Sequence, residues 1–308
     1  MAQIITPSVL EATYTAFNLL YQQAFQATSP WYSRIATPMP STTGSETYAW
    51  MKELPGLREW VGERQAIELV ERGQVLKNKP FEMTVKVPAD RIEDETIGAF
   101  NPMFQMMGRA AAKWPDEVVA SALKAGVTAL AFDGQPFFNA SHPVDMDDPG
   151  KGTYSNNKTS FALTEENYST ARAEFRSRVN DAGKPMGLSP DLLIVPPQLE
   201  DTAKRILTTD LLIRSVGSGV AADQNIQKGT AEILTIEELA DQPTTWYLAC
   251  TKLPVKPLVW QLRKAPVMTA LTQATAENVF WRQEYVYGVN ARGNAGFSLP
   301  FLITRCTA

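Results

Sequence analysis

The sequence predicts an α+β fold of mixed connectivity, and three observations favour this class. Residues 101–125 place apolar side chains at helical spacing, and a helix of this length needs a sheet to lie on. Residues 81–87 alternate apolar and polar side chains with the period of a half-buried strand. The other strand-like runs are separated by helices without a regular β–α–β alternation, so a doubly wound parallel sheet is not expected.

Composition restricts the class of protein further. The chain has 308 residues, of which 44% are hydrophobic and 20% charged, a soluble globular composition with material for about two domains. The formal net charge of −4 gives no case for nucleic-acid binding. No apolar run approaches the ~18 residues of a membrane span, and no secretory pattern is visible. Two cysteines give no disulfide framework, so a reduced, cytosolic state is the default expectation.

The single histidine, His142, limits catalytic chemistry. It excludes a His-cluster metal site and any mechanism that needs two histidines, and a hydrogen-bonding role is favoured for it. An enzyme would have to use carboxylates, lysine or this one imidazole, and the carboxylate pairs to consider are Glu93/Asp94 and Asp145/Asp147. Adjacent acids on a strand point to opposite faces, which makes Glu93/Asp94 a poor dyad. Residues 145–148 fail the EF-hand pattern, so a solvated acidic turn is expected there.

The first 30 residues carry one charged side chain, Glu11. Apolar residues including Tyr14 and Phe17 recur at roughly helical spacing, and Pro7 with Ser8 suits a helix start. Two interpretations stay open. The segment is either an ordinary buried helix or an arm that lies on a neighbouring subunit, because so uncharged a terminus would be poorly solvated if free.

Residues 52–95 are rich in charge, with eight Lys/Arg and ten Asp/Glu. Strand-like stretches at 47–51 and 81–87 flank a turn signal at 54–60 that contains a tryptophan. The pattern indicates either a solvated surface hairpin or a long two-stranded extension. A lone ribbon is marginal in water, so an extension would lie on another subunit, where charges of both signs fix its register.

The helix expected at Asn101–Ala125 contains Pro115, which should kink or restart it. Asp116 and Glu117 suit a first helical turn after the proline, and Gly126 suits the C-cap. Three methionines of this helix are expected to fill the core: Met103, Met106 and Met107.

The rest of the chain alternates helices and strands. Helices are expected at 165–180 and 198–209 and a glycine-rich polar loop at 214–230, where Gly217-Ser218-Gly219 lacks the setting of a nucleotide loop. Strands are expected at 190–197, 231–234, 245–251, 258–263, 279–291 and 297–303.

Short motifs in a fixed order resemble the Mu-like phage major head subunit family from about residue 30 to the C-terminus. The motifs are Leu130–Phe138 with His142-Pro143, Leu57–Gly62, Arg91–Glu95, Met107–Arg109, Pro115–Glu117, Pro190–Pro197 with Leu199-Glu200, and Trp246-Tyr247.

The resemblance implies an HK-97-like major capsid fold. Residues 1–42 become an N-terminal arm and 43–88 an extended hairpin, the E-loop. Residues 89–187 become a peripheral domain with the spine helix at 101–125. Residues 188–256 become an axial domain, with the 214–230 loop near the capsomer axis, and 257–308 return to the peripheral domain.

The implied function is a major capsid protein that self-assembles, as hexamers and pentamers, into an icosahedral shell enclosing phage double-stranded DNA. No catalytic, cofactor or metal site is expected, no membrane partner, and no sequence-specific DNA binding. Expected partners are a separate scaffold or protease, a portal and decoration proteins, because the chain has no room for a scaffold segment of its own. The resemblance places the protein in the virion, assembled in the host cytoplasm. Expected inter-subunit contacts are Leu57, Arg58, Glu59, Trp60, Arg64, Tyr14 and Phe17.

Two alternatives remain at this stage. A nanocompartment shell of the same fold would enclose an enzyme cargo in place of DNA. A carboxylate-dependent hydrolase would use one of the acidic pairs above.

Overall fold

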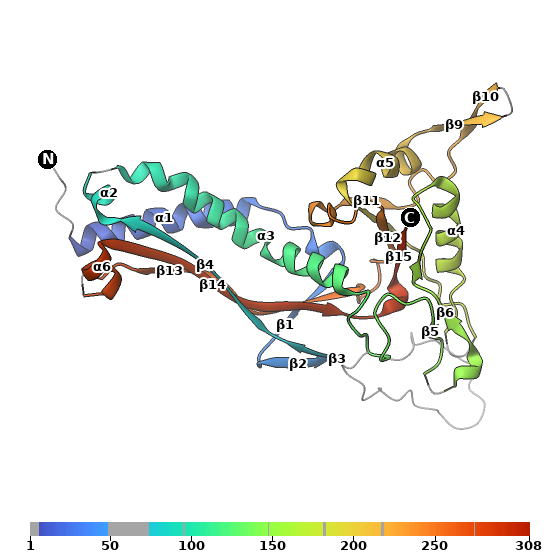
Figure 1. Ribbon diagram of the computed structural model, residues 1–308, viewed down its shortest axis with the longest axis horizontal. Helices are drawn as coiled ribbons and strands as arrows, with labels where there is room; N and C mark the ends of the chain where they lie inside the picture. The colour runs from blue at the N-terminus through green and yellow to red at the C-terminus, as the bar shows by residue number, and fades with distance from the viewer. Residues whose placement is uncertain are drawn as a thin grey trace.

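The computed structural model describes residues 6–48, 74–94, 96–146, 148–180, 183–216, 219–273 and 275–308. They form an elongated arm, built from a long sheet and two long helices, which joins a rounded lobe that holds the C-terminus (Figure 1). Helices and strands are mixed in both parts, as the sequence predicts. Within the described ranges, no helix combines the length and the apolar character that a membrane crossing requires.

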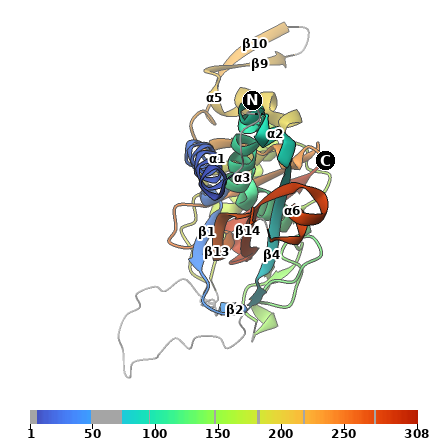
Figure 2. The ribbon, with the colours of Figure 1, turned by 90° about the vertical axis from the view of Figure 1, so that its left-hand side faces the viewer.

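The sheet of the arm has four strands in the order β1-β13-β14-β4. They are β1 (Ala36–Pro40), β13 (Leu258–Leu271), β14 (Glu284–Phe297) and β4 (Lys79–Pro88). Strand β14 is antiparallel to both β13 and β4, and β1 runs parallel to β13. The alternation that predicted β4 is confirmed, since Val85 lies opposite the buried Tyr287 of β14. Inward side chains of these strands form one face, which the helices cover (Figures 1 and 2).

Helix α3 (Asn101–Ala125) has the predicted bounds, but it runs through Pro115 without a break. A proline inside a helix removes one backbone donor and crowds the preceding turn. Packing contacts of the residues before and after Pro115 offset this loss of stability. The Trp114 ring packs edge-on against Trp260 at 4.8 Å between centroids, and Asp116 is buried. Gly126 follows in a right-handed conformation, and a Cβ there would lie 2.8 Å from the Phe138 ring, so close packing explains the glycine.

Helix α1 (Pro7–Ala27) lies along α3 of its own chain. Phe17 is fully buried, stacked on Phe104 at 3.9 Å and edge-on to Tyr287. The hydroxyl of Tyr14 donates to the backbone oxygen of Met268 in β13. The buried-helix interpretation therefore holds here. Phe17 is fully buried and Tyr14 half-buried within the chain, and the expected contacts of Tyr14 and Phe17 with a neighbouring subunit stay a prediction.

The methionine prediction is right for one residue and wrong for two. Met107 is 3% exposed and faces the sheet, whereas Met103 and Met106 are 42% and 70% exposed. The sheet-facing stripe of α3 is narrow at this end and is filled by Phe104 and Met107, so the side chains beside it point to solvent.

The lobe is built on a five-stranded sheet whose central strands are buried along their whole length. This explains the continuous apolar run of the predicted strand at 190–197. Helices α4 (Glu165–Arg176) and α5 (Glu200–Thr208) pack on one face, and the C-terminal half of α3 contributes to the core on the other. In order, the strands are β11 (Glu232–Thr235), β8 (Leu192–Val195), β12 (Thr245–Ala249), β15 (Ile303–Thr307) and β7 (Asn157–Lys158).

Several predicted bounds change. The expected 214–230 loop contains part of a hairpin, β9 (Leu211–Val216) with β10 (Gly219–Gln224), which projects from the lobe. The start of the expected strand 279–291 is instead helix α6 (Glu277–Arg282). The last residue of β4, Pro88, pairs with Glu284, so residues before Glu284 have no partner in β4. The expected strand at 297–303 is largely a 3-10 turn before β15, and β15 joins the lobe rather than the arm.

The predicted E-loop at 43–88 is divided between two sheets. Strand β4 belongs to the long sheet, whereas β2 (Ser45–Tyr48) and β3 (Gln74–Lys77) pair as a separate two-stranded hairpin. The remaining small elements are α2 (Ala89–Glu93), β5 (His142–Pro143) and β6 (Thr153–Tyr154).

Gly108 of α3 sets the distance between the two helices, and Gly108→Ala should destabilise the arm. A Cβ there would lie 2.2 Å from the Tyr21 backbone oxygen of α1, so the helices must separate. We expect a loss of about 1–3 kcal/mol in the free energy of unfolding, measured by urea denaturation. Gly98→Ala is the matched control, because no atom lies within 4 Å of its added Cβ. Equal effects from both substitutions would contradict this role for Gly108.

Candidate functional site

The polar residues that sequence analysis singled out near His142 form a buried structural cluster. His142 is fully buried, with Nδ1 2.6 Å from an Asp133 oxygen and Nε2 3.2 Å from the Phe137 carbonyl oxygen. The amide of Asn156 donates to that same carbonyl and to the Pro300 carbonyl. The predicted hydrogen-bonding role of His142 is confirmed.

Arg178, which sequence analysis did not identify, joins the same region to the end of the chain. Its guanidinium donates to the carbonyls of Phe301 and Ser155 and to the Thr304 hydroxyl, and it lies 4.3 Å from the centre of the Phe175 ring. Burial lowers the pKa of Arg178 to about 10, so it remains a cation at neutral pH. A buried cation with these acceptors ties three separate segments together.

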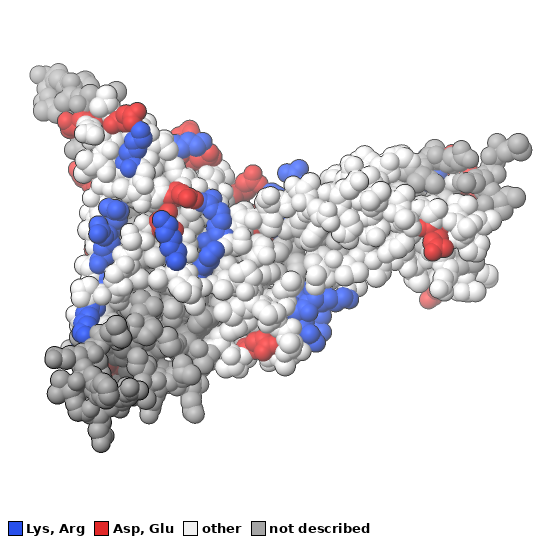
Figure 3. Space-filling view, turned by 180° about the vertical axis from the view of Figure 1, so that it is seen from behind, with Lys and Arg blue, Asp and Glu red and all other residues white. Residues whose placement is uncertain are grey.

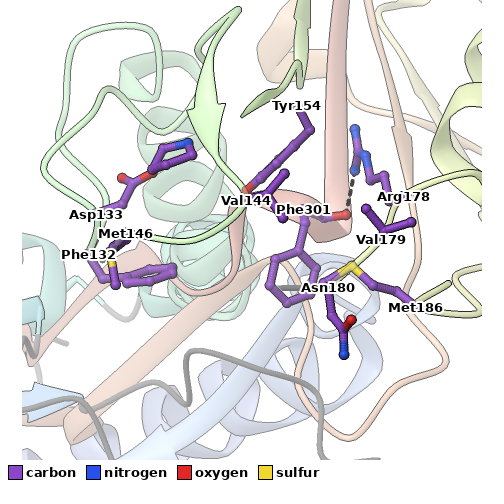
Figure 4. A pocket seen from close by; sticks show the side chains of 11 residues that line it. Phe132, Asp133, Val144, Met146, Tyr154, Arg178, Val179, Asn180, Met186 and Phe301 are labelled. Carbon is purple, nitrogen blue, oxygen red and sulfur yellow. Dashed lines mark hydrogen bonds between the residues drawn. The ribbon is translucent and has the colours of Figure 1, made fainter. Parts of the chain in front are cut away.

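The cavity beside these residues is small. Its volume is about 30 Å³, and Figure 4 shows Asp133, Tyr154 and Arg178 around it, with the Arg178–Phe301 hydrogen bond dashed. This is room for about one water molecule. The arrangement suits packing between segments and offers no space for an organic substrate.

The acidic pairs considered for hydrolysis are not assembled into a site. Glu93 ends α2 and Asp94 follows it as the cap, so the pair lies on a helix end and not on a strand. Asp145 is 5% exposed and accepts a hydrogen bond from Lys151 at 2.9 Å, which corrects the expectation of a solvated turn. Asp147 lies outside the described residues. No group of three or more His, Cys, Asp or Glu side chains that could hold a metal occurs in the described ranges.

The middle of α3 is where the N-terminal segment, the spine helix and the lobe meet. Asp116 is 1% exposed and accepts the Tyr32 backbone N–H at 2.7 Å. On the same helix, Lys124 contacts Asp241 of the lobe at 3.0 Å, and Lys113 lies 3.7 Å from Glu237. Burial raises the pKa of Asp116 to about 6, although the N–H groups of Tyr32 and Trp31 lower it.

The largest exposed apolar side chains lie at the far end of the arm. Phe280 and Trp281 of α6 are 70% and 74% exposed. Sequence analysis expected a strand over 279–291, which includes both residues, and missed this site. The available signal was their adjacency, because a strand would have put the two rings on opposite faces.

Five of the predicted contact residues lie outside the described residues: Leu57, Arg58, Glu59, Trp60 and Arg64. The hairpin from which their segment departs is anchored. Tyr48 donates its hydroxyl to Gln261 of β13 at 2.8 Å, and the Gln74 amide donates to the Leu130 carbonyl at 3.2 Å. Glu46 accepts backbone N–H bonds from Thr43 and Thr42, which lower its pKa to about 2.

The surface charge is unevenly spread. Seen from behind, lysines, arginines and acids are interspersed over the lobe, whereas much of the arm is white (Figure 3). Helix α1 contributes a single charged side chain, Glu11, along its 21 residues. An elongated chain with a nearly uncharged first helix, an exposed aromatic tip and two projecting hairpins presents surfaces suited to contacts with other proteins.

Asp116 provides a test of the contact between the N-terminal segment and α3. Asp116→Ala leaves the part-buried Tyr32 N–H without its acceptor, so the free energy of unfolding should fall by about 1–3 kcal/mol. Asp116→Asn keeps an acceptor oxygen and removes the buried charge, so its stability at pH 7 should match or exceed that of the wild type.

The same residue predicts a pH dependence. Because the pKa is raised from 3.8 to about 6 on folding, the folded state binds the proton more tightly, and wild-type stability should gain as pH falls from about 6 to about 4. Asp116→Asn should lack this gain. Urea denaturation of both proteins across this range measures it, and identical pH profiles would contradict the assignment.

Comparisons with known proteins identify the family. The family model for the Mu-like prophage major head subunit gpT matches residues 10–162, and the model for phage capsid protein matches residues 87–296. The Mu-like prophage FluMu major head subunit of Haemophilus influenzae is 26% identical over 293 residues, 95% of this chain and 71% of that protein. The major capsid protein of Escherichia phage Mu is 27% identical over 294 residues, 96% of this chain and 72% of that protein.

Comparison with solved structures leads to the same family. The bacteriophage JBD30 procapsid aligns with a TM-score of 0.61 and 30% identity, covering 99% of this chain and 76% of that one. A virus-like particle from Pyrococcus furiosus aligns at 9% identity with a TM-score of 0.53, covering 94% and 97%, which shows the fold alone. The chain therefore belongs to the phage capsid proteins, in the Mu-like major head subunit family with the HK-97-like capsid fold.

Proposed function

We propose that this chain is the major capsid protein of a phage head and that its copies self-assemble, as hexamers and pentamers, into an icosahedral shell around double-stranded DNA. The observation that carries the proposal is the match to the JBD30 procapsid subunit over 99% of the chain at 30% identity. The role is structural and non-enzymatic. In this assignment residues 89–187 and 257–308, which include most of the long-sheet arm, form the peripheral domain, and residues 188–256, which lie in the lobe, form the axial domain.

The shape of the subunit supports assembly. The β2–β3 and β9–β10 hairpins are two-stranded sheets outside the main sheets. A two-stranded ribbon is marginally stable by itself in water. Contacts with neighbouring copies would add to the packing of both hairpins in an assembled shell.

The charge of the subunit supports enclosure of DNA without tight binding. The formal net charge is −4, and a mildly acidic wall does not neutralise many phosphates. Tight phosphate binding would oppose both packaging and release.

Other phage proteins complete the proposed particle. One JBD30 structure, 28% identical with a TM-score of 0.52, is described as a capsid decorated with minor capsid protein trimers. We propose a comparable decoration protein here, together with a separate scaffold or protease and a portal. Assembly would take place in the host cytoplasm and the product would be the virion capsid.

Electron microscopy of the purified chain tests the proposal. Capsomers or closed shells are expected, and sedimentation should show material far larger than one 34.0 kDa chain. A strictly monomeric protein at high concentration would contradict the proposal. Particles that co-purify with an enzyme cargo in place of DNA would indicate a nanocompartment.

The predicted contact segment at 57–64 gives a second test. We expect Trp60→Ala to lower particle yield by about tenfold or more, the effect of losing one aromatic contact at an interface. Thermal unfolding of the unassembled subunit should stay unchanged and serves as the folding control. Wild-type particle yield from Trp60→Ala would remove Trp60 from the proposed contacts.

A further inference from the structure

A groove runs along the side of α3 that faces away from α1. It consists of two adjoining hollows of about 210 Å³ and about 460 Å³, which share Phe81, Trp114 and Glu117. One wall is α3 and the other is β4, the edge strand of the long sheet, which lies beyond α3 in the end view of Figure 2. From Ala110 to Ala125 the α3 wall is about 22 Å long, which is about four helical turns.

The lining of the groove is apolar, with small side chains on the helix wall. The rings of Phe81 and Trp114 pack at 5.1 Å between centroids where the two hollows meet. The α3 wall presents four alanines and a serine: Ala110, Ala111, Ser121, Ala122 and Ala125. Small side chains let the backbone of another helix approach closely, so the groove has the shape of an empty position in the helix layer.

Two exposed methionines extend this wall toward the outer end of the arm. Met103 and Met106 are 42% and 70% exposed, and they precede Ala110 in α3 at the spacing that puts all three side chains on one face. Methionine adapts its shape to different neighbours and is common at protein-binding surfaces. The exposed pair therefore fits a surface that a helix of another molecule covers.

Two charged side chains line the larger hollow from opposite walls. Lys79 of β4 and Glu117 of α3 are both exposed. Within the part of the chain that the structure describes, neither has an ion-pair partner. An occupant with an acid beside Lys79 and a base beside Glu117 would be complementary in charge. An apolar face flanked by such charges is the pattern of an amphipathic helix.

The helices of this chain that the structure describes do not supply such a segment. The apolar faces of α1, α3, α4 and α5 pack in cores of their own chain, and α6 has only six residues. A helix of about four turns with a free apolar face must therefore come from a protein of different sequence.

We propose that the groove between α3 and β4 binds an amphipathic helix of a different protein. The apolar face of that helix packs on Phe81, Trp114 and the alanines of α3, and its charged residues lie opposite Lys79 and Glu117. The proposal rests on the proposed function, in which a separate scaffold protein takes part in assembly, and it names where a helix of that protein would bind.

A synthetic helix tests the groove directly. The probe is a fluorescein-labelled peptide of about 18 residues, with leucines on one face and lysines and glutamates beside them. We expect saturable binding to the unassembled full chain, measured by fluorescence anisotropy. A peptide of the same composition with its leucines spread around the helix should bind at least about tenfold more weakly. No binding, or equal binding of the two peptides, would overturn the proposal.

Substitutions that fill the groove locate the binding. Ala110→Trp and Ala125→Trp each place a large ring in one of the hollows and should weaken peptide binding by about tenfold or more. Ala173→Trp, at an exposed alanine of α4 in the lobe, is the matched control and should bind like the wild type. Groove variants that bind like the control would contradict the site. Circular dichroism checks that each variant is folded.

Charge reversal tests the complementarity. Glu117→Lys places a base beside the lysines of the peptide and should weaken binding about threefold at low salt, with a smaller effect at high salt. Glu166→Lys, at an exposed acid of α4, is the control. Equal affinities of these two variants would contradict the charge pairing.

Particle formation by the chain alone separates this inference from the proposed function. Wild-type shells with no peptide binding in the groove would overturn the inference and leave the function standing. Peptide binding in the groove without shells would do the reverse. If Ala110→Trp and Ala125→Trp abolish shells of the chain purified without other proteins, while Ala173→Trp does not, the occupant is another copy and the assignment to a different protein is wrong.

Discussion

The close packing of α1 on α3 is the contact on which the rest of the arm depends. A long four-stranded sheet buries one face only if helices cover it, and α3 alone is too narrow. Gly108 lets the α1 backbone approach α3 closely, so that Phe17 reaches Phe104 and Tyr287 of the sheet. This three-ring contact joins the N-terminal helix, the spine helix and β14. This contact holds α1, α3 and the long sheet together as one packed unit.

Helix α3 joins the arm to the lobe, because it contributes side chains to the cores of both. Its first half packs in the core of the arm and its second half in the core that continues into the lobe sheet. Asp116 sits where these halves meet and holds the segment around Tyr32, while Lys124 reaches Asp241 of the lobe. The buried polar cluster of His142, Asn156 and Arg178 fixes the segment that follows α3. A subunit whose two parts are joined in this way along one helix is suited to tiling a closed surface.

Sequence predicted the features that local pattern determines. The bounds of α3, the alternation of β4 and the hydrogen-bonding role of His142 follow from periodicity and from the scarcity of histidine. The features it missed depend on partners distant in the chain. A strand was expected over Val279–Trp281. The last residue of β4, Pro88, pairs with Glu284, so β4 does not reach far enough to pair with residues 279–281. Met103 and Met106 were expected in the core, but they lie beside the sheet-facing stripe of α3 that Phe104 and Met107 fill, and they are exposed. Whether Phe17 packs within its own chain or on another depends on the approach at Gly108, which periodicity does not encode.

A cryo-electron microscopy reconstruction of particles assembled from this chain tests the account most directly. The account predicts an icosahedral shell in which each subunit's density runs without a break from residue 27 to residue 36, with α1 on the α3 of its own chain and Phe17 against Phe104. Shells in which α1 lies on the α3 of a neighbouring subunit would contradict the packing proposed here, and a failure to form shells would contradict the function.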